Sequence, residues 1–307
     1  MNPGVLQAAG PVAQSIASLS WLLFIGGGVI FAGVMLLLAW ALRRADDGSP
    51  ARVRLWILGG GVLFPGVVLA ALFAYVTPMT PVRQAAPPDA LLVSVTGRMW
   101  WWEIRYPAGA GGQEIVTANE IHIPVGRAVA ISLASDDVIH SFWIPALAGK
   151  VDMVPGQRHQ LLLSAQRAGT FRGQCAEFCG EQHAKMALHV VALPPQEFER
   201  WRQAQLRSAP AELTAQQAHG RDAFLANRCN ACHTVRGVAE TSRLGPDLTH
   251  VGSRLHLGAG TLANSPAAAA QWVAHVQQLK PGARMPSYER LDGATLTALG
   301  DWLGSLR

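Results

Sequence analysis

The sequence contains few charged residues. Asp, Glu, Lys and Arg make up 15% of its 307 residues, well below the roughly 25% usual in soluble globular chains. Apolar residues reach 50%, which excludes a disordered chain and indicates that part of the protein lies in lipid. The basic residues are spread among acids and form no run or patch, which excludes nucleic-acid binding.

Cysteine is also scarce, with four residues in the whole chain. They occur as two close pairs, Cys175 with Cys179 and Cys229 with Cys232. A disulfide framework would scatter its cysteines along the chain. The two pairs therefore indicate two separate sites.

Residues 1–42 carry no charged side chain, and Ser20–Leu42 is a continuous apolar run of 23 residues. Such a run crosses a hydrocarbon core of about 30 Å as a helix. A second uncharged run covers Leu55–Val76. The alternative for the first run is a secretory signal peptide, but the run lacks a basic n-region and exceeds an h-region of about 7–15 residues. We predict a two-helix membrane hairpin within residues 1–82.

The loop between the two runs is the basic part of this region. It holds every basic residue of the first 82: Arg43, Arg44, Arg52 and Arg54. Because cytoplasmic loops carry the excess of Lys and Arg, we expect this loop in the cytoplasm and both termini outside.

The pattern then changes to short stretches rich in Val, Ile, Leu and Trp, separated by Gly and Pro. This pattern predicts an all-β sandwich over residues 83–193. From Pro194 the sequence turns helical, which predicts a linker at 194–211 and a small all-α domain at 212–307. As a flexible coil, the linker would span roughly 5–6 Å × √n and keep the two domains at an effective concentration of millimolar order.

The first cysteine pair lies in a cluster of metal-binding side chains. The segment Cys175–Met186 offers two thiolates, the imidazole of His183 and a thioether, and His140 lies on an earlier loop. Sulfur with imidazole suits copper, and two nearby cysteines allow two thiolates to bridge two coppers. The alternatives are a disulfide or a zinc site.

The second pair belongs to Cys229-Asn-Ala-Cys232-His233, the attachment signature of haem c. Its thiols add to the haem, and the adjacent His233 ligates the iron. Met285 is the only methionine after Met186 and lies in a loop before the last helix, so we expect it to be the sixth ligand. Three histidines compete on chemistry alone: His250, His256 and His275.

With these motifs, residues 20–193 resemble subunit II of the haem–copper cytochrome c oxidases, which has a membrane hairpin followed by a cupredoxin sandwich with a binuclear CuA centre. The resemblance implies that Cys175 and Cys179 bridge both coppers. It also implies the remaining ligands: His140 and Met186 on one copper, and His183 with the backbone carbonyl of Glu177 on the other. Quinol-oxidising relatives lack these ligands, so their presence favours a cytochrome c donor.

Two further roles follow from the same resemblance. The Glu177 side chain would reach a magnesium ion shared with subunit I, and Trp100 would be the residue at which electrons enter CuA. Trp101 and Trp102 belong to the same aromatic cluster, where an indole that merely packs is the alternative. The family often places a glutamate before the second membrane helix, whereas Ala51–Trp56 contains no acid. The acids nearest to that position are Asp46 and Asp47, and the sequence does not assign either of them to proton uptake.

Residues 212–307 resemble class I cytochromes c, and Pro246 of the Gly-Pro-Asp-Leu segment matches the proline whose carbonyl accepts the second N–H of the proximal histidine. The whole chain thus resembles subunit II of a caa-type oxidase. The resemblance implies electron transfer from a donor to haem c, then to CuA, and then to the haem–copper subunit I, where dioxygen is reduced to water.

The resemblance also implies partners and a location. The partners would be subunits I and III, membrane lipid, and a soluble or membrane-bound donor such as a cytochrome c or a bc-type complex. The location would be a bacterial inner membrane, crossed more than once, with the copper and haem domains on the periplasmic or outer side. The alternatives are the CuA subunit of a nitric oxide reductase and a stand-alone membrane-anchored electron shuttle or copper-delivery protein.

Overall fold

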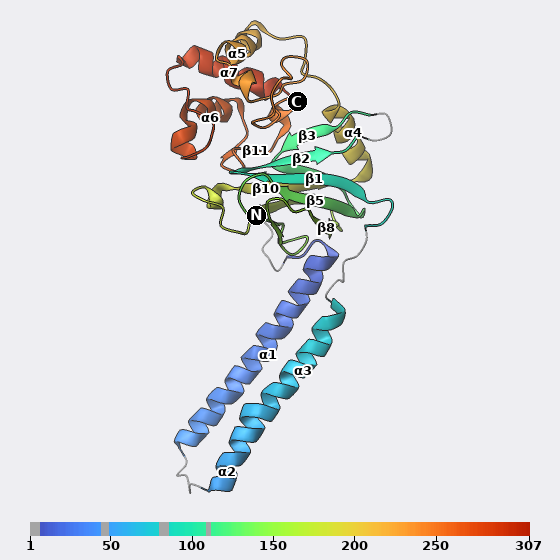
Figure 1. The fold of residues 1–307 in the computed structure, drawn as a ribbon, viewed down its shortest axis with the longest axis vertical. Coiled ribbons are helices and arrows are strands. Elements are labelled where there is room, and N and C mark those ends of the chain that lie inside the picture. Colours follow the sequence, from blue (N-terminus) through green and yellow to red (C-terminus); the bar gives the residue numbers. More distant parts are fainter. Residues whose placement is uncertain (1–6, 44–48, 80–85, 109–111) are drawn as a thin grey trace. The chain divides into compact units, whose positions relative to one another are not determined.

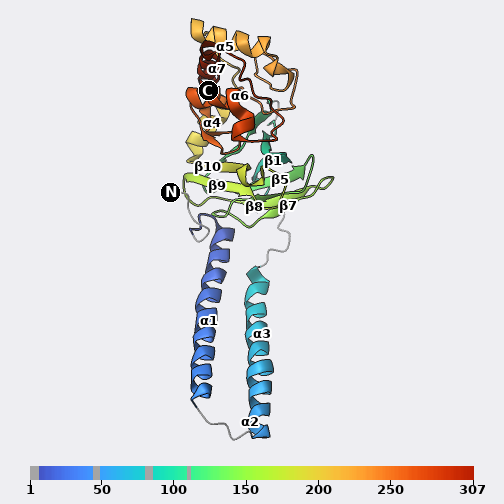
Figure 2. The same ribbon diagram turned by 90° about the vertical axis from the view of Figure 1, so that its left-hand side faces the viewer.

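The computed structural model describes residues 7–43, 49–79, 86–108 and 112–307. It divides into two compact units, residues 15–85 and residues 1–14 with 86–307, and we describe each unit by itself. Figures 1 and 2 show the elements from two sides. Their order confirms the predicted fold class, with two apolar helices, then a β-sandwich, then a small helical domain.

The membrane unit consists of two long apolar helical segments. The first is α1, Pro11–Leu42, with 32 residues, and the second covers Pro50–Met79, with 30 residues. Both are long enough to span a bilayer, and their large apolar side chains are exposed, as lipid-facing residues are. Of the charged loop residues discussed above, Arg44, Asp46 and Asp47 lie outside the described residues.

The second segment changes its winding around Pro65. It runs as α2 (Pro50–Leu55), the π-helical η1 (Trp56–Leu63), α3 (Phe64–Val76) and the 3₁₀ turn η2 (Thr77–Met79). A proline lacks the N–H of a regular helix, and its ring clashes with the carbonyl four residues before it. In η1 the N–H of Phe64 reaches the carbonyl of Gly59, five residues back, so the wider winding accommodates Pro65 without ending the helix.

The sandwich has two five-stranded sheets. One has the order β3-β2-β1-β5-β8, with β1 parallel to β5. Its strands are β1 (Leu91–Arg98), β2 (Trp101–Tyr106), β3 (Ile115–Ala118), β5 (Val129–Ser135) and β8 (His159–Leu163). The other has the order β4-β10-β9-β6-β7, with β10 parallel to β4. Its strands are β4 (Glu120–Pro124), β6 (His140–Trp143), β7 (Val151–Met153), β9 (Gly169–Cys175) and β10 (Ala187–Leu193).

The core between the sheets follows the period of two that strands impose. On β1, Val93 and Val95 are buried while their neighbours are partly or fully exposed. The rings of Trp102, Phe142 and Phe171 fill the interior. Phe142 pairs with Cys175 across β6 and β9. This packing fixes the strand ends that bear His140 and Cys175.

A short segment before α1 is part of the sandwich unit. The N–H of Ala9 donates to the carbonyl of Ala146 at 2.7 Å, and the carbonyl of Ala9 accepts from Gln166 at 2.8 Å. Ala9 itself is buried in the sandwich core. Residues 7–14 therefore pack with the sandwich, although the sequence groups them with the membrane hairpin.

The segment between the sandwich and the C-terminal domain is mostly helical. Helix α4, Pro195–Gln205, buries Phe198 and stacks Trp201 on the His122 ring, with centroids 4.2 Å apart and planes 13° from parallel. The Trp201 ring also contacts the ring of Tyr106, with centroids 5.2 Å apart. The coil estimate for 194–211 does not apply, because most of the segment is a helix packed on the sandwich.

The C-terminal domain packs its helices around a small core. Its helices are α5 (Ala215–Ala226), η4 (Cys229–Ala231), η5 (Val251–Ser253), α6 (Pro266–Leu279) and α7 (Gly293–Ser305), with a short ladder of β11 (His256–Leu257) and β12 (Leu262–Ala263). Three helices are stabilised by side chains that accept a hydrogen bond from a backbone N–H of the first turn: Thr214 for α5, Ser265 for α6 and Asp292 for α7. The rings of Phe224 and Trp302, 5.0 Å apart, join α5 to α7. The two-residue ladder and an isolated bridge between Val235 and Ala239 depart from the all-α expectation.

Candidate functional site

The first site forms where β6, β9 and the start of β10 meet. His140 begins β6, and Cys175 ends the neighbouring strand β9. The chain then loops through Cys179 and the 3₁₀ turn η3, His183–Lys185, before Met186 leads into β10. The sheet thus brings His140, 35 residues away in sequence, beside Cys175.

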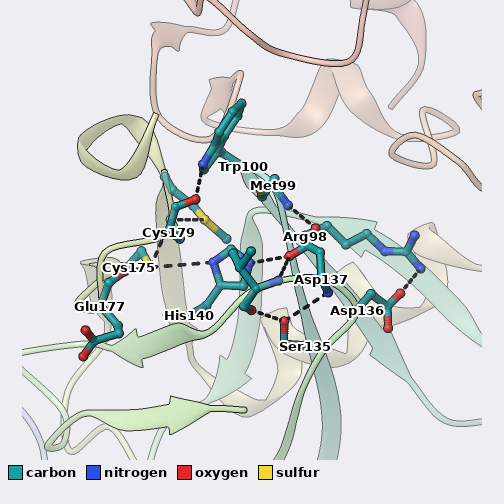
Figure 3. Close-up of polar contacts among 12 residues, drawn as sticks. Arg98, Met99, Trp100, Ser135, Asp136, Asp137, His140, Cys175, Glu177 and Cys179 are labelled. Atoms are coloured by element: carbon teal, nitrogen blue, oxygen red, sulfur yellow. Dashed lines mark hydrogen bonds and ion pairs between the residues drawn. The ribbon is translucent and has the colours of Figure 1, made fainter. Parts of the chain in front are cut away.

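The structure brings all the expected CuA ligands together, as Figure 3 shows for Cys175, Cys179 and His140. The two sulfurs are 3.7 Å apart, and both cysteines are free, so the disulfide alternative does not describe this structure. The other donors surround them. Near Cys175 Sγ lie His140 Nδ1, at 3.8 Å, and the Glu177 carbonyl, at 3.2 Å. Near Cys179 Sγ lie His183 Nδ1, at 3.6 Å, and Met186 Sδ, at 3.8 Å. Two buried thiols with imidazole and thioether donors fit copper.

The two thiols share hydrogen bonding. The two sulfurs lie within hydrogen-bonding distance of each other, and this contact lowers the pKa of Cys175 against the effect of its burial. The same bond and burial raise the pKa of Cys179. A metal ion would replace both protons, because the thiolate is the form that binds metal.

Asp137 orients the His140 ring, a role that the sequence analysis missed. Its Oδ1 lies 2.8 Å from His140 Nε2, which leaves Nδ1 facing the sulfurs. Its Oδ2 accepts from the N–H of Met99 at 2.7 Å. Partial burial opposes the effect, but these bonds lower the pKa of Asp137 overall. The acid three residues before His140 was the available signal.

Gly97 gives the same imidazole its space. A Cβ at this position would lie 2.7 Å from Cδ2 of His140, closer than side chains tolerate. Gly97 is on β1, in the opposite sheet, so the ring fills the gap between the sheets. No pattern in the sequence connects these two residues.

The three consecutive tryptophans have different environments. Trp100 is half-buried, and its Nε1 donates to the carbonyl of Cys179 at 2.8 Å (Figure 3). Trp102 is fully buried, with its ring 5.8 Å from that of Phe142. The Trp101 ring lies under the guanidinium of Arg98. Trp100 is the one of the three whose indole is hydrogen-bonded to the CuA loop.

The Glu177 side chain points away from the sulfurs (Figure 3), and its carboxylate lies 3.5 Å from the ammonium of Lys150. The backbone and side chain of Glu177 therefore face different surroundings, as the resemblance implies. The magnesium role of this carboxylate remains a prediction.

The second site is a cavity of about 430 Å³ in the C-terminal domain, closed on one side by sandwich residues that include Trp100. Its lining includes all four residues expected to hold haem c: Cys229, Cys232, His233 and Met285. The turn η4 places the cysteines and histidine on one wall, where the N–H of His233 bonds to the carbonyl of Cys229 at 3.0 Å. Met285 comes from the loop after α6.

The surroundings of His233 fit an iron ligand. Its Nδ1 lies 2.8 Å from the carbonyl of Pro246, which leaves Nε2 available to a metal. A Cβ at Gly245 would approach within 2.7 Å of His233 Cε1, so this glycine leaves room for the ring. Arg254 also lines the cavity, and its buried Nε has no hydrogen-bond partner among the described residues. Haem carries carboxylates that suit such a donor.

The competing histidines are held in other contacts. His250 and His275 do not line the cavity; His250 lies against Arg236, and His275 lies 3.5 Å from Glu289. His256 does line the cavity, but its ring stacks on His189 of the sandwich, 4.4 Å away. Met285 makes no such side-chain contact in the described part of the chain.

Two family matches coincide with the two sites. Residues 108–193 match the cytochrome c oxidase subunit II periplasmic domain, and residues 217–307 match cytochrome c. The chain belongs to the cytochrome c oxidase subunit II family. In this member of the family, a cytochrome c domain follows the subunit II domain. These domains imply copper in the first site and haem in the second.

The chain is similar to several relatives named cytochrome c oxidase subunit 2. It is 36% identical to that of Alkalihalophilus pseudofirmus, over 71% of this chain and 62% of the relative. It is 32% identical to that of Bacillus subtilis, over 71% of this chain and 63% of the relative. It thus spans less than two thirds of the length of these two relatives.

The solved periplasmic domain of subunit II of cytochrome oxidase from Bradyrhizobium japonicum is 30% identical, over 39% of this chain and 96% of that chain, with a TM-score of 0.36. The two apolar helices together with the periplasmic-domain match indicate a membrane-anchored subunit.

Proposed function

We propose that this chain is the electron-transfer subunit of a caa-type terminal oxidase. It receives electrons from a donor at haem c, passes them to binuclear CuA, and delivers them to a haem–copper subunit I that reduces dioxygen to water. The observation that carries this proposal is the position of Trp100. Its indole lines the haem cavity and also donates to the carbonyl of the copper ligand Cys179.

When bound, haem c and copper supply one-electron chemistry, and the residues around them serve to hold and orient. In the first site, Cys175 and Cys179 would hold the copper through their thiolates, and the other ligands would be His140, Glu177 through its carbonyl, His183 and Met186. In the second, Cys229 and Cys232 would hold the haem covalently, and His233 and Met285 would be the ligands of its iron. Pro246 fixes the ring of His233 through its carbonyl.

Thioether ligation of the haem suits transfer of electrons, because it raises the potential and leaves no open position on the iron. Held by two close thiolates, a pair of coppers would share one unpaired electron. The proposal assigns the oxygen chemistry to subunit I, because both sites of this chain would serve electron transfer. The names of the relatives favour an oxidase over a nitric oxide reductase.

The surroundings of the subunit follow from the same proposal. Subunit I, and subunit III beside it, would cover the hairpin, and Glu177 would contribute to a magnesium site at the border with subunit I. The domain bounds 83–193 and 212–307, joined through 194–211, place one redox centre in each domain. The arginines of the loop between the spans favour a cytoplasmic loop, which would put both redox domains outside.

The test is the order of electron transfer in the purified complex. Cys175→Ser removes a bridging thiolate and touches no haem ligand, so donor should still reduce haem c at a near-normal rate while oxygen consumption collapses. Replacing Met285 should leave copper intact but weaken its supply of electrons, because the haem potential falls. If haem c of Cys175→Ser were reoxidised by oxygen at the wild-type rate, electrons would bypass CuA and the proposed order would be wrong.

A further inference from the structure

The haem domain covers the face of the sandwich that carries Trp100. Segments 255–260 and 279–282 of the haem domain lie against it. The N–H of Ala187 donates to the carbonyl of Ala259 at 3.0 Å, and the N–H of Leu255 donates to the Glu120 carboxylate at 2.8 Å. A Cβ on Gly282 would lie 3.5 Å from the Trp100 ring. The contact therefore includes the indole that links the two redox sites.

A buried lysine lies at the centre of this contact. Lys280, at the end of α6, is only 3% exposed. Its ammonium donates to three backbone carbonyls: Trp100 at 2.7 Å, Lys185 at 2.7 Å and Gly258 at 3.0 Å. The first two belong to the sandwich and the third to the haem domain. All three N–H groups of the ammonium have acceptors, which offsets much of the cost of burying the charge.

A second lysine makes the reverse contact. Lys185 of the sandwich donates through Nζ to the carbonyl of Leu279 at 2.8 Å. Leu279 immediately precedes Lys280, and Lys185 immediately precedes the copper ligand Met186. Each domain thus gives one lysine to a carbonyl of the other. We call Lys185 and Lys280, with these carbonyl partners, the lysine clasp.

The two ends of the clasp lie next to the redox sites. Lys280 begins the loop that leads to Met285, and its acceptor Trp100 lines the haem cavity. The other end is the segment of η3, which supplies His183 and Met186 to the copper site. Because electron transfer slows steeply with distance, a contact that fixes these two loops also fixes the rate between them.

We infer that Lys280 is a positioning residue that keeps the haem domain docked on the Trp100 face, so that haem c is the fixed donor to CuA and other donors are shut out from that face. This inference rests on the proposed function. The docked domain explains why the connecting segment is a packed helix, since a domain held by a clasp has no need of a long flexible tether.

Lys280→Met tests the inference, because methionine keeps the apolar length of the side chain and removes the ammonium. The measurements use the detergent-solubilised complex with both cofactors at about pH 6, since burial lowers the pKa of Lys280 to about 7 and the charged form donates all three bonds. Pulsed EPR should give one narrow haem–CuA distance in the wild type and a broad distribution in the variant. Transfer from haem c to CuA should slow at least about tenfold.

A new reaction of the variant, direct reduction of CuA by an added donor, distinguishes a positioning role of Lys280 from a general loss of structure. In Lys280→Met, a reduced soluble c-type cytochrome should reduce CuA directly, in a phase that the wild type lacks. The CuA EPR pattern and the haem potential should not change. Arg221→Gln is the control, because it removes one positive charge from the exposed side of α5. It should leave the distance, the rate and the donor specificity as in the wild type.

Lys185→Gln is a second variant. Because the Lys185 side chain is exposed, the substitution should leave the protein folded. It should also broaden the distribution of haem–CuA distances, since it removes the bond to Leu279. Unchanged distances and rates in both lysine variants would overturn the inference. A broad distribution in the wild type, with haem c still reducing CuA, would overturn the clasp and leave the proposed function standing. Failure of wild-type haem c to reduce CuA would instead overturn the proposed function, and the inference with it.

Discussion

The indole Nε1 of Trp100 donates a 2.8 Å hydrogen bond to the backbone carbonyl of Cys179. The ring that makes this bond also lines the cavity of the haem domain. One side chain therefore contacts the loop of one redox site and the wall of the other. This relationship gives a physical route between two motifs that are separate in the sequence, Cys175–Met186 and Cys229–His233.

The cysteines of the haem motif should bind their cofactor covalently. The chain should retain haem through denaturing electrophoresis and give a peroxidase-staining band, because two thioether bonds survive unfolding. Cys229→Ala combined with Cys232→Ala should abolish the band while the polypeptide is still made. Stain that persisted in the double variant would contradict the assignment.

The copper site should contain two metal ions per chain. Two bridging thiolates delocalise one unpaired electron over both nuclei, so the EPR signal should show a hyperfine pattern that no single copper gives. Metal analysis of the purified chain should return two coppers. Zinc, or one copper with a blue-copper spectrum, would rule out the binuclear site.

Asp137 should tune the copper site although it does not bind metal. Asp137→Asn keeps the side-chain shape but weakens the bond that orients His140, so copper affinity should fall by roughly 10–100-fold. A competition titration with a chelator would measure the loss. Asp136→Asn is the matched control, because this neighbouring acid pairs with Arg98 and not with His140. Equal losses in both variants would show that the His140 contact is not the cause.

His122 should make the sandwich sensitive to acid. Burial lowers the pKa of His122 to about 3, from 6.5. The unfolded chain therefore binds the proton first, and stability should fall as pH drops from 6.5 toward 3, by ~1.4 kcal/mol per pH unit. His122→Phe retains a ring to stack on Trp201 and cannot titrate.

Thermal unfolding of the full chain in detergent, followed across this pH range, measures the effect. The variant should lose less stability than the wild type as the pH falls. His219→Gln, which changes an exposed histidine of α5, is the control. Parallel pH profiles for wild type and His122→Phe would show that His122 contributes nothing to acid lability.

The membrane orientation should follow the arginine loop. Because Arg43, Arg52 and Arg54 favour the cytoplasmic side, a reporter that is active only in the periplasm should work when fused after Arg307. The same reporter within residues 46–50 should be silent. The reverse pattern would invert the proposed topology.

The sequence by itself determined the parts and their chemistry. Uncharged runs of spanning length define the hairpin, strand-length apolar stretches define the sandwich, and the two cysteine motifs define the candidate sites. These signals are local, because each lies within one short segment and depends only on the residue types in that segment. His140 was a candidate ligand from its residue type and its loop, but the family resemblance was needed to assign it to the same copper site as Cys175, which lies 35 residues later.

Only the tertiary structure decided how the two sites are joined. The clasp of Lys185 and Lys280, the support of His140 by Asp137 and Gly97, and the packing of α4 all depend on contacts between distant segments. The acceptors of Lys280 are backbone carbonyls, and every residue has one, so no pattern of residue types can reveal them. Folding selects those carbonyls by bringing three separate loops to the same buried ammonium.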